Sequence, residues 1–280
     1  MKVAPRYDGP PIMSIGGRPD DQRAPLLRQR RRFAAMLDDL SADDWRAPSR
    51  CENWSVQDVV AHLVGVNAFW NASVQAGLAG APTRVLVGFD PAATPQLMIE
   101  PMRVLEPGAV LEQFVQSNEA LIASVESLDD AAWSRPAETP AGHVPIRLLA
   151  HHALWDAWVH ERDVALPLSL SPPVEADEVV SCLRYAAALS PAFAISDGRP
   201  CAGEYAVDAH APDCAFLLEV GDSVAVRDGA AEASVPCVRG DAVELLEALS
   251  LRVPLPASTP PEWRQVLGGL ANAFDSELPV

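Results

Sequence analysis

The hydrophobic pattern of this chain changes its period near Pro167, and this change constrains the fold more than any other feature of the sequence. Before Pro167, apolar residues recur every three to four positions over long segments, as they do in amphipathic helices. After the stretch SLSPPVEAD, short runs of alternating or continuous apolar residues are typical of strands. The sequence therefore predicts an α+β protein whose helical part comes first and whose smaller mixed part follows.

Three segments follow from this change. Residues 1–21 contain the pairs Pro10-Pro11 and Gly16-Gly17, and we expect them to be a flexible N-terminal lead-in. Residues 22–168 are expected to form a helical bundle, and residues 176–280 a small α+β domain. A chain of 280 residues is long enough to bury the cores of two modest domains.

The helical part contains four long segments with helical periodicity, at about residues 23–40, 56–74, 110–125 and 145–164. Ser41 is placed to cap a short helix through Trp45, and Ser55 with Asp58 three residues later forms a capping-box pattern. The stretch 77–107 is rich in Gly and Pro and is expected to hold loops and one short helix. We expect the basic run RQRRR, residues 28–32, to be a solvated helix face. The four long helices predict a four-helix bundle, in which facing helices build polar sites.

The C-terminal part is expected to contain a small, mainly antiparallel sheet. Candidate strands lie at residues 204–208, 214–220, 223–227 and 234–238, with Gly221-Asp222 as a tight turn. Candidate helices lie at residues 178–189 and 242–250 and from residue 262 onwards. We expect the last two helices to pack on the sheet.

Composition excludes several classes of partner. The chain has 21 Lys and Arg against 38 Asp and Glu, a formal net charge of −17. Such a field repels nucleic-acid backbones and anionic lipid, so neither nucleic acid nor membrane is expected as a partner. No apolar run reaches the roughly 18 residues of a membrane span, and the N-terminus lacks the apolar stretch of a signal peptide. The sequence favours a cytoplasmic protein, either a monomer or a homodimer.

The five cysteines show no metal-binding or redox spacing. An odd number without a CxxC pair predicts reduced, mostly structural thiols. A nucleophilic cysteine needs a nearby base, and the sequence places none. Catalysis by the protein's own thiols is therefore not expected at any of Cys51, Cys182, Cys201, Cys214 and Cys237.

One helical segment carries a stripe of possible metal ligands. His152, Asp156 and His160 are spaced four residues apart, so they lie on one face of the helix. A His and a carboxylate one turn apart can chelate a divalent ion but need a third ligand from another element. His62, inside the second long helix, is the candidate donor, and Asp58 one turn before it is placed to orient the imidazole. The spacing alone also fits a buried structural histidine and a salt-bridged helix face.

Two segments resemble a known family. Residues 40–65, LSADDWRAPSRCENWSVQDVVAHLVG, resemble the start of the mycothiol-dependent maleylpyruvate isomerase family, within the DinB-like superfamily. Residues 148–168, LLAHHALWDAWVHERDVALPL, resemble its second metal-bearing helix. The segment GDAVELLEALSLRVPLP is similar, more loosely, to the family's small sterol-carrier-like C-terminal domain. The positions that carry the first resemblance are Trp45, Pro48, Cys51, Trp54, Ser55, Val56 and His62.

The resemblance implies a DinB-like four-helix bundle that binds one divalent ion, usually zinc, through His62, Asp156 and His160. Close relatives of the characterised isomerase carry Glu at the position of Asp156. Because Asp is one methylene shorter, either the helix lies closer to the ion or His152 contributes a ligand. The cofactor implied is mycothiol, the actinobacterial counterpart of glutathione, whose thiol the ion would bind as a thiolate. Arg162, Arg199 and Arg239 are the candidate cofactor-binding residues.

The functional prediction is a metal-dependent enzyme that uses mycothiol for S-transfer to, or isomerisation of, a small electrophilic substrate. Two alternatives remain open at this point. The ion could activate water in a hydrolase, or the site could belong to a non-catalytic metal- or ligand-binding module. If a thiol cofactor is bound, we expect the open coordination position to face a cleft between the bundle and the C-terminal domain.

Overall fold

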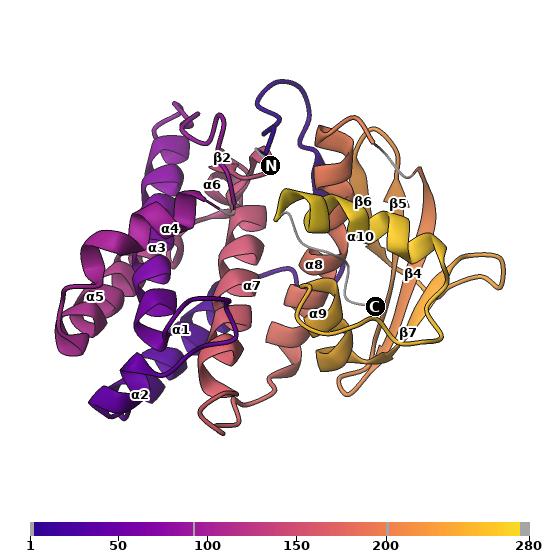
Figure 1. Ribbon diagram of the computed structural model, residues 1–280. Helices are drawn as coiled ribbons and strands as arrows, with labels where there is room; N and C mark the ends of the chain where they lie inside the picture. The colour runs from indigo at the N-terminus through magenta and orange to yellow at the C-terminus, as the bar shows by residue number, and fades with distance from the viewer. Residues whose placement is uncertain (1–2, 92, 200–201, 275–280) are drawn as a thin grey trace.

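The computed structural model describes residues 3–91, 93–199 and 202–274, and it confirms the α+β class (Figure 1). Cys201 lies outside the described residues. The first half of the fold is a bundle of helices (Figure 1). A five-stranded sheet lies on the other side of the long helix Ala176–Ser196, which packs between the bundle and the sheet. The elements of the helical part are α1 (Arg23–Asp38), α2 (Ala42–Arg46), α3 (Val56–Leu78), α4 (Thr94–Ile99), the 3₁₀ helix η1 (Glu100–Met102), α5 (Pro107–Val125), α6 (Asp130–Trp133), β2 (Pro136–Thr139), β3 (Gly142–Pro145) and α7 (Ile146–Ala165).

Helices α1, α3, α5 and α7 form the predicted four-helix bundle. Helix α3 packs against α5 and α7, and α1 packs against the same two helices, so the four close a ring. The capping box predicted at Ser55 and Asp58 is present, and the predicted cap at Ser41 forms a second one with Asp44: each Ser side chain accepts from the backbone N–H of its Asp, whose carboxylate bonds back. The stretch between α3 and α5 holds one short α-helix, α4, followed by η1, as predicted.

The second part contains α8 (Ala176–Ser196), β4 (Gly203–His210), β5 (Cys214–Val220), β6 (Val224–Asp228), β7 (Cys237–Asp241), α9 (Ala242–Leu249) and α10 (Glu262–Ala273). The strand order is β1-β6-β5-β4-β7. The two central pairings are antiparallel, whereas β1 pairs with β6 and β7 with β4 in parallel. The predicted antiparallel pairing is therefore confirmed for the three central strands. The two edge strands pair in parallel, because β1 comes from the N-terminal segment and β7 crosses to the far edge beside β4.

The prediction of a flexible lead-in over residues 1–21 is wrong for its second half. Strand β1 (Met13–Ile15) pairs with β6 in register Met13 to Val224. Ile12 and Met13 are buried in the hydrophobic core. The Gly and Pro pairs that suggested flexibility flank this apolar strand and serve as its turns, with Gly17 in a left-handed conformation.

A two-stranded hairpin, β2–β3, precedes α7 and was not predicted. Its buried Glu138 accepts hydrogen bonds from the Tyr7 hydroxyl and from the backbone N–H groups of Val85 and Leu86. Gly142 has φ +107°, and a Cβ there would lie 2.0 Å from the Arg6 carbonyl oxygen. The hairpin thus fixes both the N-terminal segment and the loop after α3 against the bundle.

Helix α8 joins the two parts into one core. It packs against α7 on one side and against β1, β5 and β6 on the other, with α10 also against it. By length and composition it is the single described helix that could cross a membrane, but 83% of its apolar window is buried inside the protein. Its side chains belong to the same hydrophobic cluster as those of α7 and the sheet. Removal of the chain after residue 170 would therefore expose α7.

The basic run on α1 is not the solvated face that we expected. Arg30 is buried and donates to Asn67 and to the Ala153 carbonyl oxygen. Arg32 bridges the buried carboxylates of Glu161 on α7 and Glu178 on α8. The acidic partners are more than a hundred residues away in sequence, so the local charge pattern could not indicate them.

The contact between α8 and α10 gives a prediction about stability. A Cβ at Gly269 would lie 2.0 Å from the Ser190 carbonyl oxygen, whereas one at the neighbouring Gly268 meets nothing within 4 Å. Gly269→Ala should therefore lower the free energy of unfolding by about 1–3 kcal/mol, because the helices must separate. Gly268→Ala should leave it unchanged or raise it by up to about 1 kcal/mol. Urea unfolding of the two variants measures the difference, and equal stabilities would contradict this packing.

Candidate metal centre

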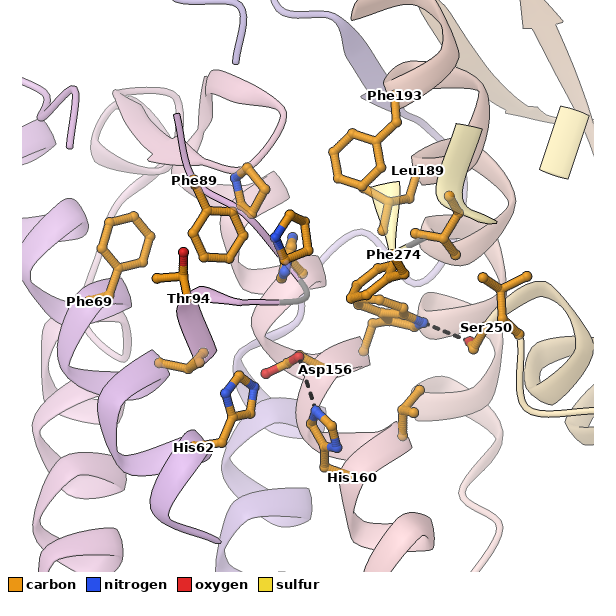
Figure 2. Close-up of a pocket in the computed structure, with 18 of the residues that line it drawn as sticks. His62, Phe69, Phe89, Thr94, Asp156, His160, Leu189, Phe193, Ser250 and Phe274 are labelled. Atoms are coloured by element: carbon orange, nitrogen blue, oxygen red, sulfur yellow. Dashed lines mark hydrogen bonds and ion pairs between the residues drawn. The ribbon is translucent and has the colours of Figure 1, made fainter. Parts of the chain in front are cut away.

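The structure brings the three predicted ligand residues together. His62 projects from α3, and Asp156 and His160 project from adjacent turns of α7 (Figure 2). One ligand atom from each residue lies within 4.8 Å of the other two. The Asp156 Oδ1 atom is 3.7 Å from His160 Nε2, and the two imidazole centroids are 5.1 Å apart. Residues from sequence positions a hundred apart thus converge on one point between two bundle helices.

Asp163 orients the His160 ring. Its Oδ2 atom lies 3.0 Å from His160 Nδ1. This contact places a proton on Nδ1 and leaves Nε2 to face Asp156 and His62. Burial lowers the pKa of His160, but the Asp163 hydrogen bond, the Cys51 contact and the Asp156 carboxylate outweigh it and raise the pKa to about 10. Nε2 is thus the His160 nitrogen that faces Asp156, and a metal ion bound there would take the place of a proton on it.

Two arginines hold Asp163 in its ionised form. Arg50 Nε donates to Oδ1 at 3.0 Å, and Arg252 donates from Nε and Nη2 at 2.8–3.2 Å. Burial alone would raise the pKa of Asp163, but the His160 hydrogen bond and the Arg252 guanidinium hold that pKa far below its usual range. Histidines that bind a metal through one ring nitrogen commonly donate the other N–H to a carboxylate, as His160 does to Asp163. We predicted neither Asp163 nor the two arginines for this role.

His62 has the protonation state that a ligand needs. Burial and the neighbouring His160 hold its pKa well below the usual range, so the imidazole is neutral. Its Nδ1 atom is buried and has no hydrogen-bond partner among the described residues. Asp58 does not orient it, contrary to our prediction, because its carboxylate accepts from Ser55 at the helix start and from Arg103.

This donor set fits a divalent ion. Two imidazoles and one carboxylate are typical ligands of zinc, and three protein ligands are the usual number where one position stays open. The neutral His62 imidazole has a nitrogen within reach of the Asp156 and His160 ligand atoms, so it can offer a lone pair to an ion held there. A second group of possible ligand atoms, Cys51, His160 and Asp163, shares one member with the first. It fits less well, because both Asp163 oxygens already accept from arginines.

Two earlier expectations about nearby residues change. His152 lies on the same face of α7 but belongs to neither group of ligand atoms, and its Nδ1 atom is hydrogen bonded to the Tyr185 hydroxyl. Cys51 lies beside the candidate ligand group, which its sequence did not predict. Its Sγ atom is 3.7 Å from His160 Nδ1 and 3.3 Å from Asp163 Oδ2. The sequence placed no base near any cysteine because these residues are a hundred positions apart.

The metal centre opens on a cavity of about 350 Å³ between the bundle and the second part of the chain (Figure 2). Helices α3, α7 and α8 contribute to its wall, together with the loop before α4 and residues 250–252 after α9. Trp155 Nε1 donates to Ser250 Oγ at 2.9 Å and closes one side. The aromatic side chains of the wall are Phe69, Trp70, Phe89, Trp155, Phe193 and Phe274.

None of the three arginines predicted for the cofactor is in this wall as the structure describes it. Arg162 is buried under the Trp158 ring, 3.5 Å from its centroid. Arg199 pairs with Asp197, and Arg239 with Asp208, both at exposed positions. Arg252 is the arginine that lines the cavity. Arg252 lies in the segment GDAVELLEALSLRVPLP, which carried the looser family resemblance. The sequence could not single it out, because an exposed and a buried arginine look alike in a sequence.

The fold is thus a four-helix bundle with a buried His–Asp–His group beside a cavity. The chain belongs to the mycothiol maleylpyruvate isomerase N-terminal domain family, which matches residues 26–165. This confirms the resemblance seen in the sequence. The match includes all three candidate ligands and ends where α7 ends.

Solved structures share the fold beyond the bundle. The crystal structure of the mycothiol-dependent maleylpyruvate isomerase is 18% identical, with a TM-score of 0.60 over 87% of this chain and 95% of that chain. A histidine-to-alanine mutant of the same isomerase gives the same values. YfiT from Bacillus subtilis matches 59% of this chain and 95% of its own at 14% identity, with a TM-score of 0.43. No curated protein matched in a sequence search.

The ligand group gives a prediction about metal content. The purified protein should bind about one zinc ion per chain, and His160→Ala should lose most of it because two ligands remain. His152→Ala is the matched control, since it removes a histidine from the same face of α7 without touching the ligand group. Elemental analysis after dialysis reads both. Loss of zinc in the His152 variant but not in Asp156→Ala would show that the wrong member of the stripe was chosen.

The support of His160 gives a second prediction. Asp163→Asn should weaken zinc binding by about 10- to 100-fold, the usual effect of removing a group that hydrogen bonds to a metal ligand. Asp58→Asn is the control, because it also alters a buried, arginine-paired aspartate but contacts no candidate ligand. Competition with a zinc-binding dye measures both affinities. Equal losses in the two variants would argue that Asp163 acts only through general stability.

Proposed function

We propose that this protein is a metal-dependent enzyme that binds mycothiol and activates its thiol for S-transfer to, or isomerisation of, a small electrophilic substrate. The observation that carries the proposal is the position of the His62, Asp156 and His160 group at the wall of a cavity. A structural metal site has four protein ligands and is closed, whereas this group has three and adjoins a space large enough for a small molecule. The family supports a thiol as the molecule that enters.

The chemistry explains why a metal and a thiol belong together. A free thiol with a pKa of about 8.5 is only a few per cent thiolate at neutral pH. A bound divalent ion supplies the positive charge that makes the thiolate the stable form. The protein's own residues prepare the position: Asp163 keeps the proton of His160 on Nδ1, and burial keeps His62 neutral. The apolar walls exclude water from the same space.

The fold favours a site shared by both parts of the chain. Arg252, which follows α9, both lines the cavity and holds Asp163, so the second part contributes to the metal centre itself. This supports the expectation that a large polar cofactor is bound where the bundle and the C-terminal part meet. It also means that the full chain is the correct protein for every functional assay.

Cobalt provides a direct test of thiol activation. The Co²⁺-loaded full chain should show a thiolate-to-cobalt charge-transfer band in the near ultraviolet when mycothiol is added. His62→Ala should abolish the band by removing a ligand. The Ser-for-Cys analogue of mycothiol is the control, because it has the same sugars but no sulfur, and it should give no band and bind at least about tenfold more weakly, a difference of about 1.4 kcal/mol.

The same titration separates the alternatives. Equal binding of mycothiol and its oxygen analogue, with no new band, would exclude thiol activation and leave water activation or simple ligand binding. A thiol-dependent band without turnover of any electrophile would favour a binding module. Thiol-dependent consumption of an electrophile in the zinc form alone completes the case for an enzyme.

A further inference from the structure

We infer that the electrophile accepted beside this metal centre is an uncharged molecule with an apolar, aromatic or branched body, and not a small dicarboxylate. The inference rests on the proposed function and specifies its substrate class. It departs from the substrate in the name of the structurally similar isomerase, because maleylpyruvate carries two carboxylates. Three observations carry it: the composition of the cavity wall, the state of its polar groups, and its charges.

The wall beyond the ligand group is mostly apolar. Phe69 and Phe89 lie on the α3 side, and Phe193 and Phe274 face them across the cavity (Figure 2). Trp155 and Leu189 continue the wall between these two sides. Aromatic and aliphatic walls stabilise a bound molecule by removing its apolar surface from water. Such walls offer nothing to replace the water around a carboxylate.

The polar groups of the wall outside the ligand set are uncharged, Arg252 excepted, and one of them, the buried Trp70 Nε1–H group, has no hydrogen-bond partner among the described residues. Ser250 accepts from Trp155, and Thr94 accepts from the backbone N–H of Asp90. His152 Nδ1 is bonded to Tyr185. Burial lowers the pKa of His152 to about 3, so this imidazole contributes no positive charge at neutral pH. These groups can orient a single carbonyl but do not form an anion-binding site.

The charges of the site are also balanced without the substrate. Arg252 is the one arginine or lysine in the wall as described, and its guanidinium is bound to Asp163 through both Nε and Nη2. At the centre, a divalent ion, the Asp156 carboxylate and a thiolate add to zero net charge. A dicarboxylate would therefore be buried without a cation of its own, which is strongly unfavourable.

A pair of ligands that differ in charge tests the inference. Benzylideneacetone is an uncharged aromatic enone, and its para-carboxylate keeps the ring and the enone and adds one negatively charged group. Isothermal titration calorimetry of the zinc-loaded full chain, without thiol, should give a Kd at least about tenfold lower for the uncharged enone. Maleate, a small dicarboxylate, should bind more weakly than either.

Turnover of the same molecules is measured separately, with mycothiol present. The thiol adds across the C=C bond, sulfur to the β-carbon and hydrogen to the α-carbon, so no further reactant is needed. The uncharged enone should be consumed faster than its carboxylate in the zinc form. Tighter binding or faster consumption of the carboxylate or of maleate would overturn this inference and leave the proposed function standing. If none of the three molecules is consumed with thiol, the result counts against the proposed function. The inference about the substrate then falls with it, even where calorimetry shows the expected binding preference.

A charge placed in the wall provides the matched variant test. Met98 lines the cavity and is 38% exposed, whereas its neighbour Leu97 on α4 is 75% exposed and is not part of the wall. Met98→Arg should reduce the preference for the uncharged enone about tenfold or more by supplying a cation. Leu97→Arg adds the same charge to the same helix and should leave the preference unchanged. An unchanged preference in Met98→Arg, or an equal change in both variants, would contradict the charge argument.

Discussion

The buried carboxylate of Asp163 is the group on which the geometry of the candidate metal centre depends. Its side chain is buried, and it is stable there because Arg50, Arg252 and His160 all donate to it. Removing one partner from such a buried group is costly, because the remaining charge is left uncompensated. The same contacts decide which nitrogen of His160 faces His62 and Asp156. One ionised side chain thus connects the loop before α3, helix α7 and the segment after α9.

The fold places the site at the junction of its two parts because α8 fills the space between them. The helix is almost entirely buried, and it separates α7 from the sheet while contacting both. The cavity remains where α8, α3 and residues 250–252 do not meet, and large aromatic side chains cover its surface. On α8, the close contact with α10 at Ser190 therefore lies next to the open volume beside Leu189. The dry wall and the balanced charges are both consequences of this geometry.

Much of this arrangement could be predicted from the sequence, because its signals are local. The capping pattern at Ser55 and the four-residue spacing of Asp156 and His160 depend only on neighbouring residues. His62 was already the candidate third ligand from its place in the second long helix, and the family resemblance supported it. The features that were missed depend on distant partners. Strand β1, the pairing of Arg32 with Glu178 and the Arg252–Asp163 contact each join segments far apart in the chain. No periodicity or spacing rule reports on such pairs.

The contact between Asp163 and Arg252 joins the two parts of the chain, and this has a consequence for their evolution. The bundle supplies all three candidate ligands, but the cation at Arg252 comes from a segment that folds with the other half of the chain. A descendant that kept the bundle and exchanged its partner domain would leave a buried carboxylate short of a donor. It would have to recruit a new arginine or lysine at that spot, or lose the acid. In chains that keep Asp163, we therefore expect both parts to have been retained together during evolution, even where their sequences have diverged widely.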